Sequence, residues 1–151
     1  IATILRGFGE ERFARQIAKG IVMARKSGPI RRTGELVEVI HQSTPLRYQH
    51  GRTHFATRTF QALRMAVNDE LGAIEAGMRG ILPLLTPGGR IAVISFHSLE
   101  DRLVKRAFQS WQREGRAHML TRKVVRPGQE ELDRNPRARS AKLRAVEKSG
   151  D

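Results

Sequence analysis

Several residue types and patterns are missing from this sequence. It has no cysteine, one tryptophan, one tyrosine and no long apolar run. The lack of cysteine excludes disulfide bonds, thiolate nucleophiles and cysteine-ligated zinc, and it fits a reducing compartment, so we expect a cytoplasmic protein. The longest candidate for an apolar run, residues 91–96, is far short of the roughly 18 residues that a membrane-spanning helix needs. We therefore expect no membrane partner.

Length and composition favour a folded, globular chain. The 151 residues include 39% hydrophobic and 28% charged side chains, with 14 glycines and 6 prolines. This composition excludes collagen-like and low-complexity chains, and the length suffices for one ordinary domain or two small ones. The chain begins at Ile1 with neither a methionine nor a signal-peptide pattern. We expect either a processed start or a part of a longer protein.

Positive charge is concentrated towards the two ends of the chain. Lysine and arginine number 28 against 15 aspartates and glutamates, a net charge of +13. Residues 1–60 carry +7, residues 61–100 carry −1 and residues 101–151 carry +7. Two basic flanks indicate surfaces that meet a polyanion, most commonly nucleic acid. A basic surface that serves only solubility is the alternative.

Apolar side chains recur with helical spacing over much of the first half of the chain. We predict a helix over residues 10–26, followed by a shorter helix that Thr33 caps. Residues 43–56 have no periodicity and are expected to form a basic loop. Residues 57–85 predict two helices or one bent helix, with a break at residues 68–70.

The second half of the chain predicts strands as well as helices. Residues 90–96 are apolar on both alternating faces, the pattern of a buried parallel strand covered by helices on both sides. A helix is predicted over residues 98–113, with Ser98 as its cap. Two further strands are predicted over residues 119–125 and 141–147. Helices first and strands with helices afterwards favour an α/β fold.

The turn from the predicted strand into the next helix is the most informative segment, Ser95-Phe-His-Ser-Leu-Glu-Asp-Arg102. In open α/β sheets, ligands bind beyond the carboxyl ends of the strands. Ser95, His97 and Asp101 would place a hydroxyl, an imidazole and a carboxylate there, beside a helix N-terminus. The alternative is a well-capped helix with His97 hydrogen-bonded in its own turn. A Ser-His-Asp nucleophile is not favoured, because the G-x-S-x-G elbow is missing.

A basic segment interleaves cations with aromatic rings, which is typical of sites that pair phosphate contacts with base stacking. Its residues are Arg47, Tyr48, Arg52, Phe55 and Arg58. The alternative is a solvated loop. Residues 134–140 could hold phosphate through three guanidinium groups or form a charged connection. His50 and His54 lie in a loop without a nearby carboxylate, so we expect no metal site.

Four blocks of the sequence resemble one known family. They are Gly9-Glu-Glu-Arg-Phe-Ala-Arg15, Ala56-Thr-Arg-Thr-Phe-Gln-Ala-Leu-Arg64, Gly88-Gly-Arg-Ile-Ala-Val-Ile-Ser-Phe-His-Ser-Leu-Glu-Asp-Arg102 and Asn135-Pro-Arg-Ala-Arg-Ser140. The most specific motif among them is S-F-H-S-L-E-D-R. Together the blocks are similar, over nearly the whole chain, to the bacterial 16S ribosomal RNA cytosine-N4 methyltransferases known as RsmH or MraW.

The resemblance implies a class I, Rossmann-like α/β fold that uses S-adenosyl-L-methionine, with a helical substrate domain inserted into its sheet. Residues 1–66 would be most of the inserted domain, and residues 67–151 the C-terminal half of the methyltransferase domain. The glycine-rich cofactor loop and the acidic ribose-binding position of the family have no match here. The resemblance therefore assigns no cofactor-binding residue to this chain, and we expect the chain alone to be inactive.

The implied reaction is methylation of N4 of a cytosine in the decoding region of 16S rRNA, with that rRNA or the small ribosomal subunit as partner. The candidates for lining the base pocket are Ser95, His97 and Asp101. The candidates for RNA contacts are Arg47, Tyr48, Arg52, Arg58, Arg64, Arg102, Arg137 and Arg139. A non-catalytic basic RNA-binding domain and an assembly module that binds a protein partner remain alternatives. The sequence also leaves open a homodimer.

Overall fold

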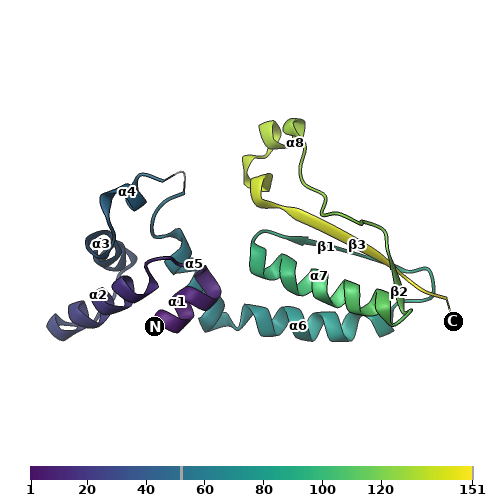
Figure 1. Ribbon diagram of the computed structural model, residues 1–151, viewed down its shortest axis with the longest axis horizontal. Coiled ribbons are helices and arrows are strands. Elements are labelled where there is room, and N and C mark those ends of the chain that lie inside the picture. Colours follow the sequence, from purple (N-terminus) through teal and green to yellow (C-terminus); the bar gives the residue numbers. More distant parts are fainter. Residues whose placement is uncertain (52, 151) are drawn as a thin grey trace. The chain divides into compact units, whose positions relative to one another are not determined.

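The computed structural model describes residues 1–51 and 53–150, which fall into two units. We call Ile1–Glu70 the helical unit and Leu71–Asp151 the sheet unit (Figure 1). Among the described residues, no helix is both long and apolar enough to cross a membrane. The candidate RNA contact Arg52 lies outside the described residues.

Packing between helices distant in sequence builds the helical unit. Its helices are α1 (Ala2–Gly9), α2 (Ala14–Ser27), α3 (Thr33–Ser43), α4 (Leu46–Gln49) and α5 (Thr57–Asn68). α1 packs against α5, and α2 packs against α3 (Figure 1). The core between them contains the buried side chains of Leu5, Ala14, Ile17, Ile21, Ile40, Ala56 and Ala62. Since each helix buries one apolar face, the helical unit has a core of its own.

Gly9 allows α1 to approach α5 closely. A Cβ at this position would collide with the carbonyl oxygen of Arg58 and press on the Cβ of Ala62. Only glycine therefore fits at this contact, which holds the end of α1 against the first turns of α5.

The predicted helix over residues 10–26 is wrong at its start. Glu10 ends α1 in a left-handed backbone conformation with φ at 48°, and α2 begins only at Ala14. Periodicity alone does not reveal this break, because the apolar stripe continues through it. Glu11 lies in the break and is only 2% exposed.

Two local predictions for the helical unit also need correction, and one is confirmed. Thr33 does not cap α3, because Arg32 is the N-cap residue, and the Glu35 carboxylate accepts hydrogen bonds from nearby backbone N–H groups. Residues 43–56 are not all loop, since they contain the short helix α4. The predicted break at residues 68–70 is confirmed by Asp69, whose φ of 47° ends α5.

The sheet unit contains a three-stranded sheet together with α-helices and 3₁₀ helices. Its elements are α6 (Glu70–Ile81, which begins in the helical unit), the 3₁₀ helix η1 (Leu82–Leu84), β1 (Arg90–Ser95), α7 (Ser98–Arg113), β2 (Ala117–Met119), α8 (Gln129–Arg134), the 3₁₀ helix η2 (Pro136–Ser140) and β3 (Lys142–Lys148). α7 lies along the sheet (Figure 1). Phe108 and Trp111 of α7 form a buried cluster with Ile91 and Val146 of the sheet, and Met78 of α6 packs against it. The predicted helix over residues 98–113 is confirmed.

The prediction that residues 90–96 form a parallel strand covered on both sides is wrong for this chain. The strand order is β1-β3-β2, and both pairs are antiparallel. Opposite residues of antiparallel strands share a face. The register therefore defines an outer sheet face with an apolar part, made of Ala92, Ile94, Val125, Leu143 and Ala145, and a polar end, made of Arg90, His118 and Glu147. Ile94 is 57% exposed on that face. An apolar pattern on both faces specifies neither the strand direction nor the element that covers each face.

The two later strands are predicted unequally well. β3 matches the prediction over residues 141–147 to within one residue at each end. The strand predicted over residues 119–125 is wrong in its extent, because β2 covers Ala117–Met119 and only Val125 forms a further bridge, to Leu143. Pairing with β3 decides the extent of β2, and that partner lies far along the sequence.

Candidate functional site

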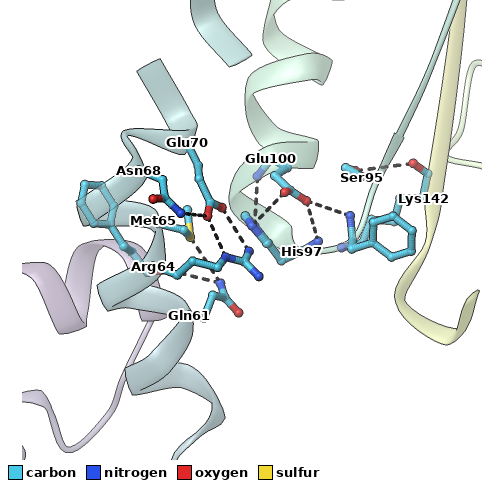
Figure 2. A network of polar contacts seen from close by, with 11 residues as sticks. Gln61, Arg64, Met65, Asn68, Glu70, Ser95, His97, Glu100 and Lys142 are labelled. Atoms are coloured by element: carbon cyan, nitrogen blue, oxygen red, sulfur yellow. Dashed lines mark hydrogen bonds and ion pairs between the residues drawn. The ribbon is translucent and has the colours of Figure 1, made fainter. Parts of the chain in front are cut away.

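The turn after β1 holds His97 as the N-cap of α7. The backbone of His97 is extended, and its Nδ1 accepts a hydrogen bond from the Glu100 N–H at 3.3 Å. In return, one Glu100 carboxylate oxygen accepts bonds from the N–H groups of Phe96 at 2.8 Å and His97 at 3.1 Å (Figure 2). These reciprocal bonds form a capping box. The predicted cap Ser98 is therefore wrong, since Ser98 is already the first residue of the helix.

This geometry limits what the His97 ring can do. Its Nδ1 is occupied as an acceptor, so the neutral ring carries its proton on Nε2. Nε2 lies 3.1 Å from the other Glu100 carboxylate oxygen, and the side chain is only 14% exposed. The arrangement corresponds to the alternative of a well-capped helix. The imidazole is held in one orientation rather than left available as a proton acceptor.

Ser95 and Asp101 also have partners within the sheet unit. Ser95 is 4% exposed, and its hydroxyl donates to the Lys142 carbonyl oxygen at 3.5 Å (Figure 2). Asp101 accepts two hydrogen bonds from the Arg144 guanidinium, at 2.7 and 3.1 Å. The hydrogen bond from Arg144 holds the pKa of the Asp101 carboxyl below its usual range.

The three predicted pocket residues thus lie at one strand-to-helix turn. Each of them also makes a hydrogen bond that stabilises the fold. His97 caps α7, Ser95 bonds across to β3, and Asp101 ties α7 to Arg144 of β3. A turn fixed in this way can orient a group placed against it. A deprotonated Asp101 held by a guanidinium is a weak base, so this carboxylate is poorly suited to accept a proton.

A second cluster of predicted residues lines a cavity in the helical unit. Arg47, Tyr48 and Arg58 lie on α4 and α5 around a cavity of about 540 Å³. The lining also includes two residues from the segment between α1 and α2 that the sequence reasoning did not select, Arg12 and Phe13. No local pattern indicates them, because only the folding of α4 over that segment brings them near Tyr48.

Tyr48 is fixed by a buried acid. Its hydroxyl donates to the Glu11 carboxylate, with oxygen distances of 2.8 and 3.0 Å. Burial, and next the bond to Glu11, raise the pKa of Tyr48 to about 12. The ring also meets Phe13 edge to face, with centroids 4.8 Å apart. The Glu11 carboxylate also accepts a hydrogen bond from the Phe13 N–H at 3.0 Å. Glu11 therefore fixes the positions of both Phe13 and Tyr48.

The remaining candidates are not among the residues that line this cavity. Phe55 is half-buried, and it packs on the core of the helical unit and stacks with His54. Arg64 pairs with Glu70 at 2.7 Å within the helical unit (Figure 2). Arg102 is exposed on α7, and the exposed Arg137 and Arg139 belong to η2.

Comparison with known proteins identifies the family. The MraW methylase family matches residues 1–149. The chain belongs to the MraW family. The ribosomal RNA small subunit methyltransferase H of Symbiobacterium thermophilum is 50% identical over 98% of this chain and 51% of its own length. The proteins of the same name from Coprothermobacter proteolyticus and Rhodopirellula baltica are 49% and 51% identical, over 98% of this chain and 48% and 45% of their lengths. The chain thus spans about half the length of the curated relatives it matches.

The motifs of this MraW-family chain coincide with the structural features described above. S-F-H-S-L-E-D-R forms the end of β1 and the capped first turn of α7. N-P-R-A-R-S forms η2 and the residue before it. The block from Gly9 to Arg15 includes the break with Glu11, Arg12 and Phe13. The segments that carry the resemblance therefore form a helix cap, a 3₁₀ helix and the break between two helices.

Proposed function

We propose that this chain is the C-terminal half of a methyltransferase that transfers a methyl group from S-adenosyl-L-methionine to N4 of a cytosine in small-subunit rRNA. The match of the MraW family to residues 1–149 carries this proposal. We further propose that the helical unit is most of an inserted substrate domain, and that the sheet unit is one end of a Rossmann-like catalytic domain.

The residues of this chain do not by themselves fit the cofactor. The turn from β1 to α7 contains no glycine, so its backbone does not resemble a glycine-rich phosphate or nucleotide loop. The nearest carboxylates, Glu100 and Asp101, are engaged by the helix cap and by Arg144. We therefore propose no cofactor contact at this turn.

Positioning is the task that these residues can perform. The exocyclic amine of cytosine is a poor nucleophile because its lone pair is delocalised, so the reaction needs an aligned base and an acceptor for the departing proton. The base must also leave its stack to enter a pocket. We propose that one edge of that pocket is kept in a fixed conformation by Ser95, His97 and Asp101. The proton acceptor is expected outside this set of residues.

The outer sheet face supports a larger catalytic domain. Ile94 and Val125 on this face are 57% and 49% exposed, and Phe96 just beyond β1 is 54% exposed. Contiguous apolar surface of this kind indicates a covering element. Among the described residues, β1 also has no partner strand on the edge away from β3. Relatives of about twice this length have enough further chain to supply both.

Calorimetry with S-adenosyl-L-methionine tests whether cofactor binding needs the chain upstream of these residues. We expect no tight binding by the 151-residue chain and tight binding by the protein extended upstream to the length of its relatives. The extended protein should then produce N4-methylcytidine in small-subunit rRNA, detected by mass spectrometry of the nucleosides. Tight cofactor binding by the short chain would contradict the cofactor argument, and methylation at another atom would contradict the assigned position.

Two alternative functions predict different experimental results. A non-catalytic RNA-binding domain would bind RNA with a steep salt dependence, while the extended protein would show no cofactor affinity. An assembly module would bind a protein partner with which RNA does not compete. The identity of about 50% with rRNA methyltransferases favours neither.

A further inference from the structure

Three arginines line the cavity of the helical unit from three separate segments. Arg12 precedes α2, Arg47 lies on α4 and Arg58 lies in the first turn of α5. Within residues 1–51 and 53–150, none of the three forms an ion pair with a carboxylate. A 3.0 Å hydrogen bond to the Glu10 carbonyl oxygen holds the Arg58 guanidinium in place. Three cations that line one cavity and form no ion pair among the described residues favour an anionic ligand.

Aromatic rings line the same cavity. Phe13 and Tyr48 are both half-buried there, and the bond from Tyr48 to the buried Glu11 restricts the tyrosine ring. A phosphate ion gains little from such rings. A nucleic-acid base stacks on aromatic rings whatever its identity. The combination therefore favours a ligand that has both a phosphate and a base.

The size of the cavity restricts the ligand further. Its volume of about 540 Å³ lies within the roughly 300–1,000 Å³ typical of small-molecule sites. A double helix presents convex rows of phosphates and keeps its bases stacked inside, so its bases cannot reach rings within a cavity. A single-stranded nucleotide turned out of its stack can fill the cavity with both of its parts.

We propose that this cavity binds one unstacked nucleotide of single-stranded RNA, with the phosphate on Arg12, Arg47 and Arg58 and the base against Phe13 or Tyr48. The inference rests on the proposed function and adds to it an anchor for one nucleotide of the substrate strand. Glu11 acts here as a positioning residue, since it holds Tyr48 and the segment before α2 together.

The charge contribution is tested on the 151-residue chain with a fluorescein-labelled single-stranded oligoribonucleotide that contains cytidine. Arg47→Ala should weaken binding about fivefold to tenfold and reduce the slope of affinity against salt concentration by about one. Arg31→Ala is the matched control, because Arg31 is also exposed in the helical unit but lies outside the cavity. We expect a much smaller loss from the control variant.

The base contribution needs a separate measurement. Tyr48→Leu should weaken binding about fivefold to 100-fold, the range measured for removing one stacking ring. In the wild type, an abasic nucleotide at one position of the strand should cause a similar loss, and in Tyr48→Leu it should cause almost none. A photoreactive iodinated cytidine at that position should crosslink to Phe13 or Tyr48. Circular dichroism checks that each variant is folded, and the crosslink on the wild type does not depend on any variant.

The outcomes separate this anchor from the proposed function. Equal affinities of Arg47→Ala and Arg31→Ala would overturn the anchor, as would crosslinks only outside the cavity. Loss of affinity in Arg47→Ala without any effect of the abasic nucleotide would mean that the cavity takes phosphate alone, which also overturns it. None of these results affects methylation by the extended protein. Failure of that methylation would instead overturn the proposed function.

Discussion

The helical unit and the sheet unit differ in how they bury their apolar side chains. Leu5, Ile17 and Ile40 of the helical unit have no exposed surface, and helices surround them. In the sheet unit, α6 and α7 bury one face of the sheet, while Ile94 on the other face is 57% exposed. Exposed apolar side chains such as Val67 do occur in the helical unit, but they do not form a continuous face of paired strands.

The polar groups of the two units differ in a parallel way. Arg12 and Arg47 of the helical unit line a cavity and form no ion pair with the residues that the structure describes. The sheet unit uses its most distinctive polar residues internally, in the cap at His97 and the pair of Asp101 with Arg144. The helical unit thus leaves charged side chains around a cavity, whereas the polar residues at the turn after β1 in the sheet unit stabilise the fold.

The largest expected effect separates the stabilities of the two units. Phe108 is fully buried beside Trp111, the sole tryptophan. Phe108→Ala should lower the free energy of unfolding of the sheet unit by about 3–5 kcal/mol, because it leaves a cavity in the core. Urea unfolding followed by Trp111 fluorescence measures this loss. Ile17→Ala in the helical unit should leave the Trp111 transition in place, and an equal shift would show that the units unfold together.

A smaller effect is expected from the ion pair between α7 and β3. The side chains of Arg144 and Asp101 are 8% and 17% exposed. Asp101→Asn should cost about 3 kcal/mol, at the low end for breaking a buried pair because both groups keep some contact with water. The same Trp111 transition reports the change. Asp133→Asn on the exposed surface of α8 is the control and should change stability much less.

The same pair predicts the acid sensitivity of the sheet unit. The pKa of Asp101 is lowered in the folded state, so its contribution is complete above the unfolded value of about 4 and is lost as the pH falls through the lower folded value. Urea midpoints between neutral pH and pH values below about 4 should therefore fall more steeply in the wild type than in Asp101→Asn. Parallel curves would contradict this role of the pair.

The next prediction concerns the acid beneath the cavity of the helical unit. Tyr48 is the sole tyrosine, so its ionisation can be followed by absorbance. Glu11→Gln should lower the Tyr48 pKa from about 12, but not fully to the ordinary value of about 10, because burial remains the larger cause. A raised tyrosine pKa stabilises the fold below about pH 10, and this contribution is lost as the pH rises through the folded value. Glu38→Gln on α3 should leave the titration unchanged.

The smallest effect is expected at the helix cap. His97→Ala should cost about 1 kcal/mol of sheet-unit stability, the usual value for an N-cap, while His97→Asn should preserve most of it. In the extended protein, His97→Asn should retain methylation if His97 only supports the turn. Loss of methylation in a stable His97→Asn protein would instead indicate direct contact of the imidazole with the reacting base.

Sequence patterns predict the elements of this protein better than their partners. The helix over residues 98–113 and the break near Asp69 follow from local spacing and are confirmed. The parallel direction predicted for β1 is wrong, since an apolar strand has the same pattern whether its neighbours are parallel or antiparallel. The burial of Glu11 and its bond to Tyr48 are equally invisible, because they depend on a contact between residues 37 positions apart.

The candidate sites, too, are predicted only as far as local sequence allows. The S-F-H-S-L-E-D-R motif directs attention to the correct turn, but only coordinates distinguish a capping imidazole from one that faces a ligand. Arg47, Tyr48 and Arg58 are selected from their local composition, whereas Arg12 and Phe13 join them only through the tertiary fold.

The strand order has a consequence for synthesis. β3 is translated after β1 and β2, yet it lies between them and pairs with both. A nascent chain that has reached η2 therefore has neither strand pair and must keep its apolar strands from aggregating until Lys142–Lys148 leaves the ribosome. A nonsense codon just ahead of β3 would accordingly remove the strand that joins β1 to β2, instead of trimming one edge.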